Sequence, residues 1–98
     1  MKVAYPVIIT QGEKDLIVYI PDFKVNTQGD DIPDSIAMAR DAIGLVGICI
    51  LDDGESLPQP SDIEAVRRDA GKGDIVTLVD IDFEEYRKEI EKLETCDF

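Results

Sequence analysis

Carboxylates are the only side chains in this sequence that are numerous enough to suggest metal binding or acid–base catalysis. The 98 residues include 22 Asp and Glu and no histidine, so the commonest general base and metal ligand at neutral pH is missing. Asp80 and Asp82 lie two residues apart near the end of a predicted strand, project to the same face and could hold Mg²⁺. The plainer interpretation, which we favour, is a strand end followed by a helix cap.

A second acidic group, Asp52-Asp53-Gly54-Glu55, could also gather a cation, but its spacing is not that of a calcium loop. Helix capping and solubility explain it better. Cys49 and Cys96 are far apart and, without histidine, cannot build a zinc site. The sequence therefore predicts no catalytic residue, no metal site and no cofactor, and its cysteines are expected to be reduced thiols in the cytoplasm.

The net charge of −12 is the most unusual property of the composition. An acidic surface repels phosphate backbones, because nucleic-acid affinity rests on Lys and Arg that displace counterions. A basic protein partner is the better hypothesis, because surfaces of opposite charge raise the association rate of two proteins. The alternative is that the acidity only provides solubility. No secretory signal is apparent, and the most apolar run is about half of the ~20 residues that a membrane span needs, so a cytoplasmic protein is expected.

Four segments have the composition of β-strands. Val3–Thr10 has apolar residues on both faces, and Leu16–Ile20 follows a turn and would form a hairpin with it. Val25–Gln28 would complete a meander, and Ile75–Ile81 is a further strand. Three strands in a row, one long helix and one more strand predict an α+β fold with the helix packed on the sheet.

The long predicted helix carries the strongest signal. It starts at Asp30 or Asp31, either of which can cap it, and Pro33 suits its first turn. Its second half, Ala42–Leu51, is apolar on every side, whereas a surface helix keeps one polar face. Because the sheet of so short a chain covers only one side of this helix, a second copy or a partner is expected to cover the other.

Two glycines interrupt the apolar half of the helix. Gly44 and Gly47 each cost about 1 kcal/mol in a helix relative to alanine, which suggests that another backbone approaches closely there. The alternative is a kink or a looser helix. We predict a dimer or tetramer whose helix contacts involve Gly44, Leu45, Gly47 and Ile48.

Two further helices are predicted after the long one. Ser61-x-x-Glu64 has the form of a capping box for a short helix, and Asp82 can cap a final helix that starts at Phe83. The last segment is strongly acidic and is expected to be a tether more than a part of the core. The predicted division is an α+β domain over residues 1–81 and an acidic C-terminal helix and tail over 82–98.

Several short motifs occur in the same order in one known family. They are Tyr19-Ile20-Pro21-Asp22-Phe23, Thr27-Gln28-Gly29-Asp30, the helical segment Ile36–Ile43 and the loop Asp53–Ser61. In these residues the chain resembles the HicB antitoxin family from Tyr5 to about Ile81. We interpret Pro21, Thr27, Gln28 and Gly29 as a structural motif, in which Pro21 and Gly29 fix the loop between the second strand and the helix.

The resemblance implies a partial ribonuclease-H-like fold, with three antiparallel strands, a helix and a fourth strand beside the first. It also implies oligomerisation and neutralisation of a small basic ribonuclease, the HicA toxin, by a protein that is not itself catalytic. The residues agree, because a ribonuclease-H-like nuclease needs an acidic residue in the middle of its first strand and Val3–Thr10 has none.

The sequence departs from the family pattern in two places. Lys24-Val25-Asn26 stands where many relatives carry Pro-Gly-Cys, which bears on the loop geometry more than on the fold. Many relatives also continue into a helix-turn-helix or ribbon-helix-helix domain, and none follows here, so operator binding by this chain is not expected.

The sequence thus predicts a non-catalytic, antitoxin-like protein that binds a small basic ribonuclease. A homo-oligomeric structural protein without a toxin partner is the alternative, and a metal-dependent nuclease using Asp80 and Asp82 is a third hypothesis. The predicted partner contacts lie at the ends of the sheet and helix: Asp22, Asp30, Asp52, Asp53 and Glu55. For each of them the alternative role is a turn or a cap.

Overall fold

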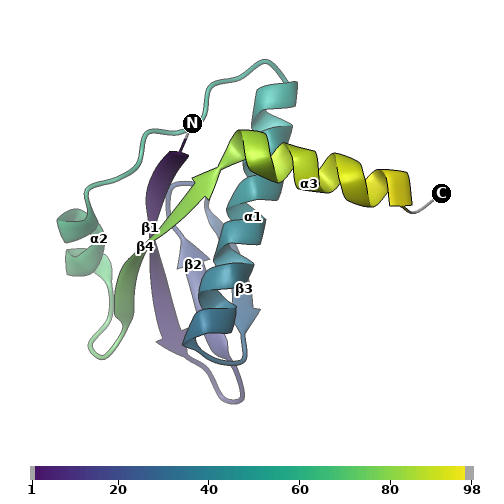
Figure 1. The fold of residues 1–98 in the computed structure, drawn as a ribbon. Helices are drawn as coiled ribbons and strands as arrows, with labels where there is room; N and C mark the ends of the chain where they lie inside the picture. Colours follow the sequence, from purple (N-terminus) through teal and green to yellow (C-terminus); the bar gives the residue numbers. More distant parts are fainter. Residues whose placement is uncertain (1, 97–98) are drawn as a thin grey trace.

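The computed structural model describes residues 2–96, with side chains through Glu91. Its elements are β1 (Lys2–Gln11), β2 (Leu16–Ile20), β3 (Val25–Gly29), α1 (Ile32–Asp52), α2 (Ile63–Asp69), β4 (Ile75–Asp82) and α3 (Phe83–Cys96), shown in Figure 1. The strands form one antiparallel sheet in the order β3-β2-β1-β4. The predicted meander and the fourth strand beside the first are therefore confirmed.

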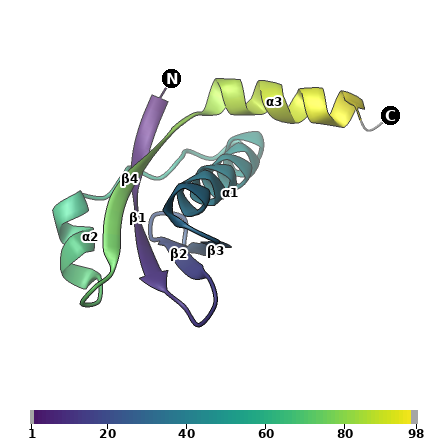
Figure 2. The same cartoon turned by 60° about the horizontal axis from the view of Figure 1, so that its bottom comes forward.

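The helices occupy three different places around this sheet. α1 covers one face, and α2 lies on the opposite face against β1 and β4 (Figure 2). α3 crosses the C-terminal half of α1 on a face turned away from the sheet (Figures 1 and 2). In the part of the chain that the structure describes, no helix is long and apolar enough to cross a lipid bilayer.

The core lies between the sheet and α1. Side chains alternate along the strands, and those on the α1 face are buried: Tyr5, Val7, Ile9, Val18, Ile20, Val79 and Ile81. Ala39 and Ile43 of α1 pack on them. Removing this apolar surface from water is the main force that fixes the helix on the sheet.

α1 begins where the sequence predicts. Asp31 is the N-cap, and its carboxylate accepts the backbone N–H of Asp34 at 2.8 Å, while the carboxylate of Asp34 accepts the N–H of Asp30 at 2.9 Å. The preceding Gly29 is buried, and a Cβ there would lie 2.6 Å from the backbone nitrogen of Ser35. This glycine of the sequence motif therefore lets the first turn of α1 lie directly on β3.

The acidic run after α1 contains the end of the helix. Gly54 has a φ of 80°, and its N–H donates to the carbonyl of Leu51 at 3.0 Å. The N–H of Glu55 donates to the carbonyl of Ile50 at 3.1 Å, which completes a Schellman motif. The run therefore has the capping role that we favoured over cation binding.

The cap of α2 differs from the predicted one. Asp62, not Ser61, is the N-cap, and its carboxylate accepts the N–H of Glu64. The N–H and the hydroxyl of Ser61 instead donate to the carboxylate of Asp22, at 3.0 and 2.5 Å. The prediction was wrong because this contact with the turn after β2 withdraws Ser61 from the helix end.

α3 is joined to the core, which corrects the expectation of an acidic tether. Asp82 caps it as predicted, since its carboxylate accepts the N–H groups of Glu84 and Glu85 at 3.0 and 3.3 Å. The next residue, Phe83, is only 6% exposed and belongs to the same buried cluster as the sheet. Acidic residues dominate the composition of this segment, so composition alone does not reveal its apolar face. Phe83 and Tyr86 form that face one turn apart.

Candidate protein–protein interfaces

The two glycines of α1 form a notch that receives α3. A Cβ on Gly44 would lie 2.6 Å from three ring carbons of Tyr86, and a Cβ on Gly47 would overlap the ring of Phe83. The close approach predicted from the glycines therefore exists, but aromatic side chains of the same chain make it in place of a second backbone. α3 thus covers the side of the apolar half of α1 that carries Gly44 and Gly47.

Polar contacts fasten α3 beside the notch. The hydroxyl of Tyr86 donates to the carboxylate of Asp41 at 2.5 Å, and burial, followed by this hydrogen bond, raises the pKa of Tyr86. Arg87 Nη2 donates to Asp52 Oδ1 at 2.7 Å, and this bond raises the pKa of Arg87. α3 is therefore tied to α1 at two positions about three turns apart.

Three of the four residues predicted to contact another copy are buried inside the chain. They are Gly44, Gly47 and Ile48, whereas Leu45 is 48% exposed. The crossing of α3 is the physical reason, because it occupies the surface that a second copy was expected to cover. A contact between copies at Leu45 stays a prediction.

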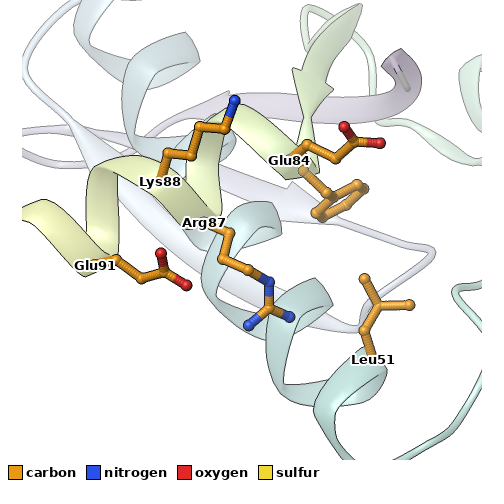
Figure 3. Close-up of a pocket in the computed structure, with 6 residues that line it drawn as sticks. Leu51, Glu84, Arg87, Lys88 and Glu91 are labelled. Atoms are coloured by element: carbon orange, nitrogen blue, oxygen red, sulfur yellow. The ribbon is translucent and has the colours of Figure 1, made fainter.

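An open cavity of about 350 Å³ lies beside this helix crossing (Figure 3). It is lined by Leu51, Phe83, Glu84, Arg87, Lys88 and Glu91. Arg87 points from α3 toward α1, and Lys88 points to the other side of α3 (Figure 3). The two acidic and two basic side chains of the lining balance in charge, and Arg87 is held by Asp52, so the cavity is a gap between two packed helices. Its lining contains no Ser, Cys, Thr, His or Tyr side chain.

The five acidic residues predicted to contact a partner do not gather in one place. Asp30 precedes α1 and Asp52 ends it, and a helix of 21 residues separates them by about 30 Å. Asp53 is the C-cap residue of α1, and Glu55 follows it on the surface. Asp22 lies elsewhere, in the turn between β2 and β3. These five residues therefore do not form one cluster.

The carboxylates considered for metal binding are engaged in other contacts. Arg40 donates through Nη2 to Asp80 Oδ1 at 3.1 Å and through Nε to the Asp80 carbonyl at 2.8 Å, and the side-chain bond lowers the pKa of Asp80. The pKa of Asp82 is lowered chiefly by the N–H of Glu85. Across residues 2–96, no three or more His, Cys, Asp or Glu side chains come together in a group that could hold a metal ion.

The face of the sheet opposite α1 is only partly covered. α2 packs Val66 against it, and an open groove of about 390 Å³ remains between α2 and β2. The groove is lined by Ile8, Tyr19, Pro21, Ser61, Ala65, Val66 and Asp69. Tyr19 is 37% exposed, and Asp22 borders the groove because it holds Ser61.

The sequence motifs alone did not identify this groove. One available signal was β2, Leu16–Ile20, which is apolar at every position and therefore on both faces. The α1 face of such a strand is buried by the core, so the other face needs a cover too. α2 supplies only part of that cover.

The four residues of the sequence motif lie in different places. Pro21 lines the groove, Gly29 lies under α1, and Thr27 and Gln28 pair with β2.

An acidic α+β domain with a half-covered sheet face has the features of a protein that acts by binding another. A family model described as the HicB_like antitoxin of bacterial toxin-antitoxin systems matches residues 5–96. The chain belongs to this antitoxin family, and the resemblance seen in its motifs is confirmed.

Solved structures with the same fold include toxin–antitoxin complexes. One chain from a toxin–antitoxin complex of Streptococcus pneumoniae is 25% identical, with a TM-score of 0.75 over 88% of this chain and 73% of that one. A chain of the HicA3 and HicB3 complex is 26% identical, with a TM-score of 0.64 over 82% of this chain and 99% of that one. The Burkholderia pseudomallei antitoxin HicB, at 24% identity and a TM-score of 0.69, shares the fold over 82% of this chain and 62% of that one. No curated protein matches the chain.

Proposed function

We propose that this protein neutralises a small basic ribonuclease of the HicA type by binding it, in the cytoplasm and without catalysis of its own. The family match over residues 5–96 carries this proposal. Similarity to chains from two toxin–antitoxin complexes supports a toxin as the partner. The net charge of −12 supports a basic one, because opposite fields raise the association rate.

The groove between α2 and β2 is the proposed centre of the toxin contact. Tyr19 offers a half-exposed aromatic ring, a residue type enriched among side chains that dominate binding energy. Asp22 and Asp69 place carboxylates at its margin, where they can meet basic side chains. The remaining predicted contacts would lie outside this groove and would raise the association rate by attracting the basic toxin. They are Asp30, Asp52, Asp53 and Glu55.

Co-expression with any small basic ribonuclease that the adjacent reading frame encodes tests the proposal. The expected result is that the chain restores growth and co-purifies with the toxin. Tyr19→Lys places a cation in the groove and should abolish both effects, whereas Ile75→Lys adds the same charge at an exposed residue outside it and should abolish neither.

Failure of the folded wild-type chain to bind any such neighbour would contradict the proposal. The homo-oligomeric binding protein without a toxin would then be the remaining candidate. Loss of binding in Ile75→Lys equal to that in Tyr19→Lys would contradict the assignment of the groove.

A further inference from the structure

The groove between α2 and β2 has one aromatic wall and one helical wall. Tyr19 stands on the sheet face opposite α1, across from Ile8 on β1, and Pro21 follows two residues later. Ala65 and Asp69 lie four residues apart on α2, so they share the helix face that forms the other wall. The small side chain of Ala65 leaves the space between the two walls open.

The groove is apolar at its base and negative at its margin. Ile8 of β1 lies beneath it, and Val66 of α2 is packed on the sheet with only 5% of its surface exposed. Asp69 is the one charged residue among the lining side chains of the described chain, and Asp22 borders the groove through Ser61. An occupant of this groove therefore meets apolar surface and negative charge together.

Asp69 has no partner of its own within the part of the chain whose side chains are described. Its carboxylate takes part in no hydrogen bond or ion pair there, whereas both oxygens of Asp22 accept from Ser61. Asp69 is also the last residue of α2, where the terminal carbonyl groups of a helix make the potential negative. Arg67 in the same turn is held by Glu64. A cation bound in the groove would therefore stabilise the charge of Asp69.

We propose that this groove binds a single arginine side chain of the partner protein. The inference rests on the groove proposed above as the centre of the toxin contact, and it names the chemical group that enters it. The guanidinium lies on the ring of Tyr19 and donates to the carboxylate of Asp69. The methylene groups of the arginine pack on the apolar base formed by Ile8 and Val66.

The size and the chemistry of the groove favour arginine over other occupants. An open volume of about 390 Å³ is near the lower end for small-ligand pockets, so it accepts one long side chain. A planar guanidinium stacks on an aromatic ring and donates two parallel N–H groups to one carboxylate, whereas the ammonium of lysine is a strongly hydrated point charge. The net charge of −12 attracts a basic partner to the chain as a whole.

Titration of the folded full chain with N-acetyl-arginine methylamide, followed by NMR, tests the proposal without any toxin. Saturable shifts are expected at the amides of Tyr19, Ala65 and Asp69. The citrulline analogue, which has the shape of arginine without the charge, should bind at least about tenfold more weakly, and the lysine analogue at least about threefold more weakly. Shifts that do not saturate or that spread over the acidic surface would overturn the proposal, as would equal binding of either analogue.

Two carboxylate variants separate a specific contact from general attraction. Asp69→Asn should weaken binding of the arginine compound at least about fivefold, and the fold should tolerate it because a carboxylate is disfavoured at a helix C-terminus. The matched control, Asp53→Asn, removes the same charge at the C-cap of α1 and should change binding less than about twofold. Equal weakening in both variants, or none in Asp69→Asn, would contradict the assignment.

A third variant tests the aromatic wall. Tyr19→Leu keeps an apolar side chain and removes the ring, so it should weaken binding of the arginine compound at least about threefold and reduce its advantage over the lysine compound. An unchanged preference for arginine would show that the ring does not hold the guanidinium.

The titration separates this inference from the function on which it rests. A chain that neutralises a ribonuclease but does not bind the arginine compound would overturn the inference and leave the proposed function intact. A chain that binds the compound through Tyr19 and Asp69 but no toxin would support the arginine site and contradict the proposed function.

Discussion

Replacement of Gly47 by alanine tests whether Phe83 fills the notch on α1. Helix propensity alone predicts that Gly47→Ala stabilises the protein by about 1 kcal/mol. The structure predicts the opposite sign, because the new Cβ would lie 2.9 Å from Cζ of Phe83 and closer still to Cε1. Phe83 is buried, so its ring has little room to withdraw.

The expected net effect is a loss of about 1 kcal/mol. Overpacking of a filled site typically costs about 1 to 3 kcal/mol, and the propensity gain offsets about 1 kcal/mol of it. For a domain of this size, a loss of 1 kcal/mol lowers the melting temperature by about 4 to 8 °C. Thermal unfolding followed by circular dichroism resolves such a change.

A double-mutant cycle identifies the cause of the loss. Phe83→Leu should remove most of the penalty of Gly47→Ala, with a coupling energy of about 1 kcal/mol. Cys49→Ala, at an exposed position on the same helix, should change stability by less than about 0.5 kcal/mol. A higher melting temperature for Gly47→Ala, or additive effects in the cycle, would refute the packing of α3 on α1.

Three further predictions follow from contacts elsewhere in the fold. Gly29→Ala pushes a Cβ against helix backbone that cannot rotate away, so it should cost about 3 kcal/mol in urea denaturation, and a neutral result would contradict the packing. Tyr5→Phe removes the bond from its hydroxyl to the carbonyl of Pro58 at 2.8 Å and should cost about 1 kcal/mol, while an unchanged midpoint would exclude that bond. The pKa of Asp80 lies below its ordinary value of 3.8, so its pair with Arg40 stabilises the fold above about pH 4 and this contribution is lost as the pH falls further. In Arg40→Gln the Asp80 pKa measured by NMR should rise toward 3.8, and an unchanged value would disprove the pairing.

Local patterns predicted the strands and the start of α1 because each depends on nearby residues. The β-type composition of β1 and β2, the cap at Asp31 and the glycine at position 54 are all signals within a few positions. Local signals could not decide whether Ser61 or Asp62 caps α2. That choice depends on Asp22, which is 39 residues away in sequence.

The candidate site was harder to predict than the fold. The glycines at 44 and 47 correctly indicated a close approach, but the sequence cannot say whether the approaching group comes from the same chain. Composition also cannot show which carboxylates are already engaged, as Asp52 is by Arg87. The groove beside Tyr19 exists only once α2 is placed on the sheet.

Titration of a purified small basic ribonuclease, taken from an adjacent reading frame that encodes one, with this protein tests the central claim most directly. Ribonuclease activity should fall to background near equimolar protein at low salt, and the residual activity should rise as salt screens the attraction. Undiminished activity in the presence of excess folded protein would contradict the account.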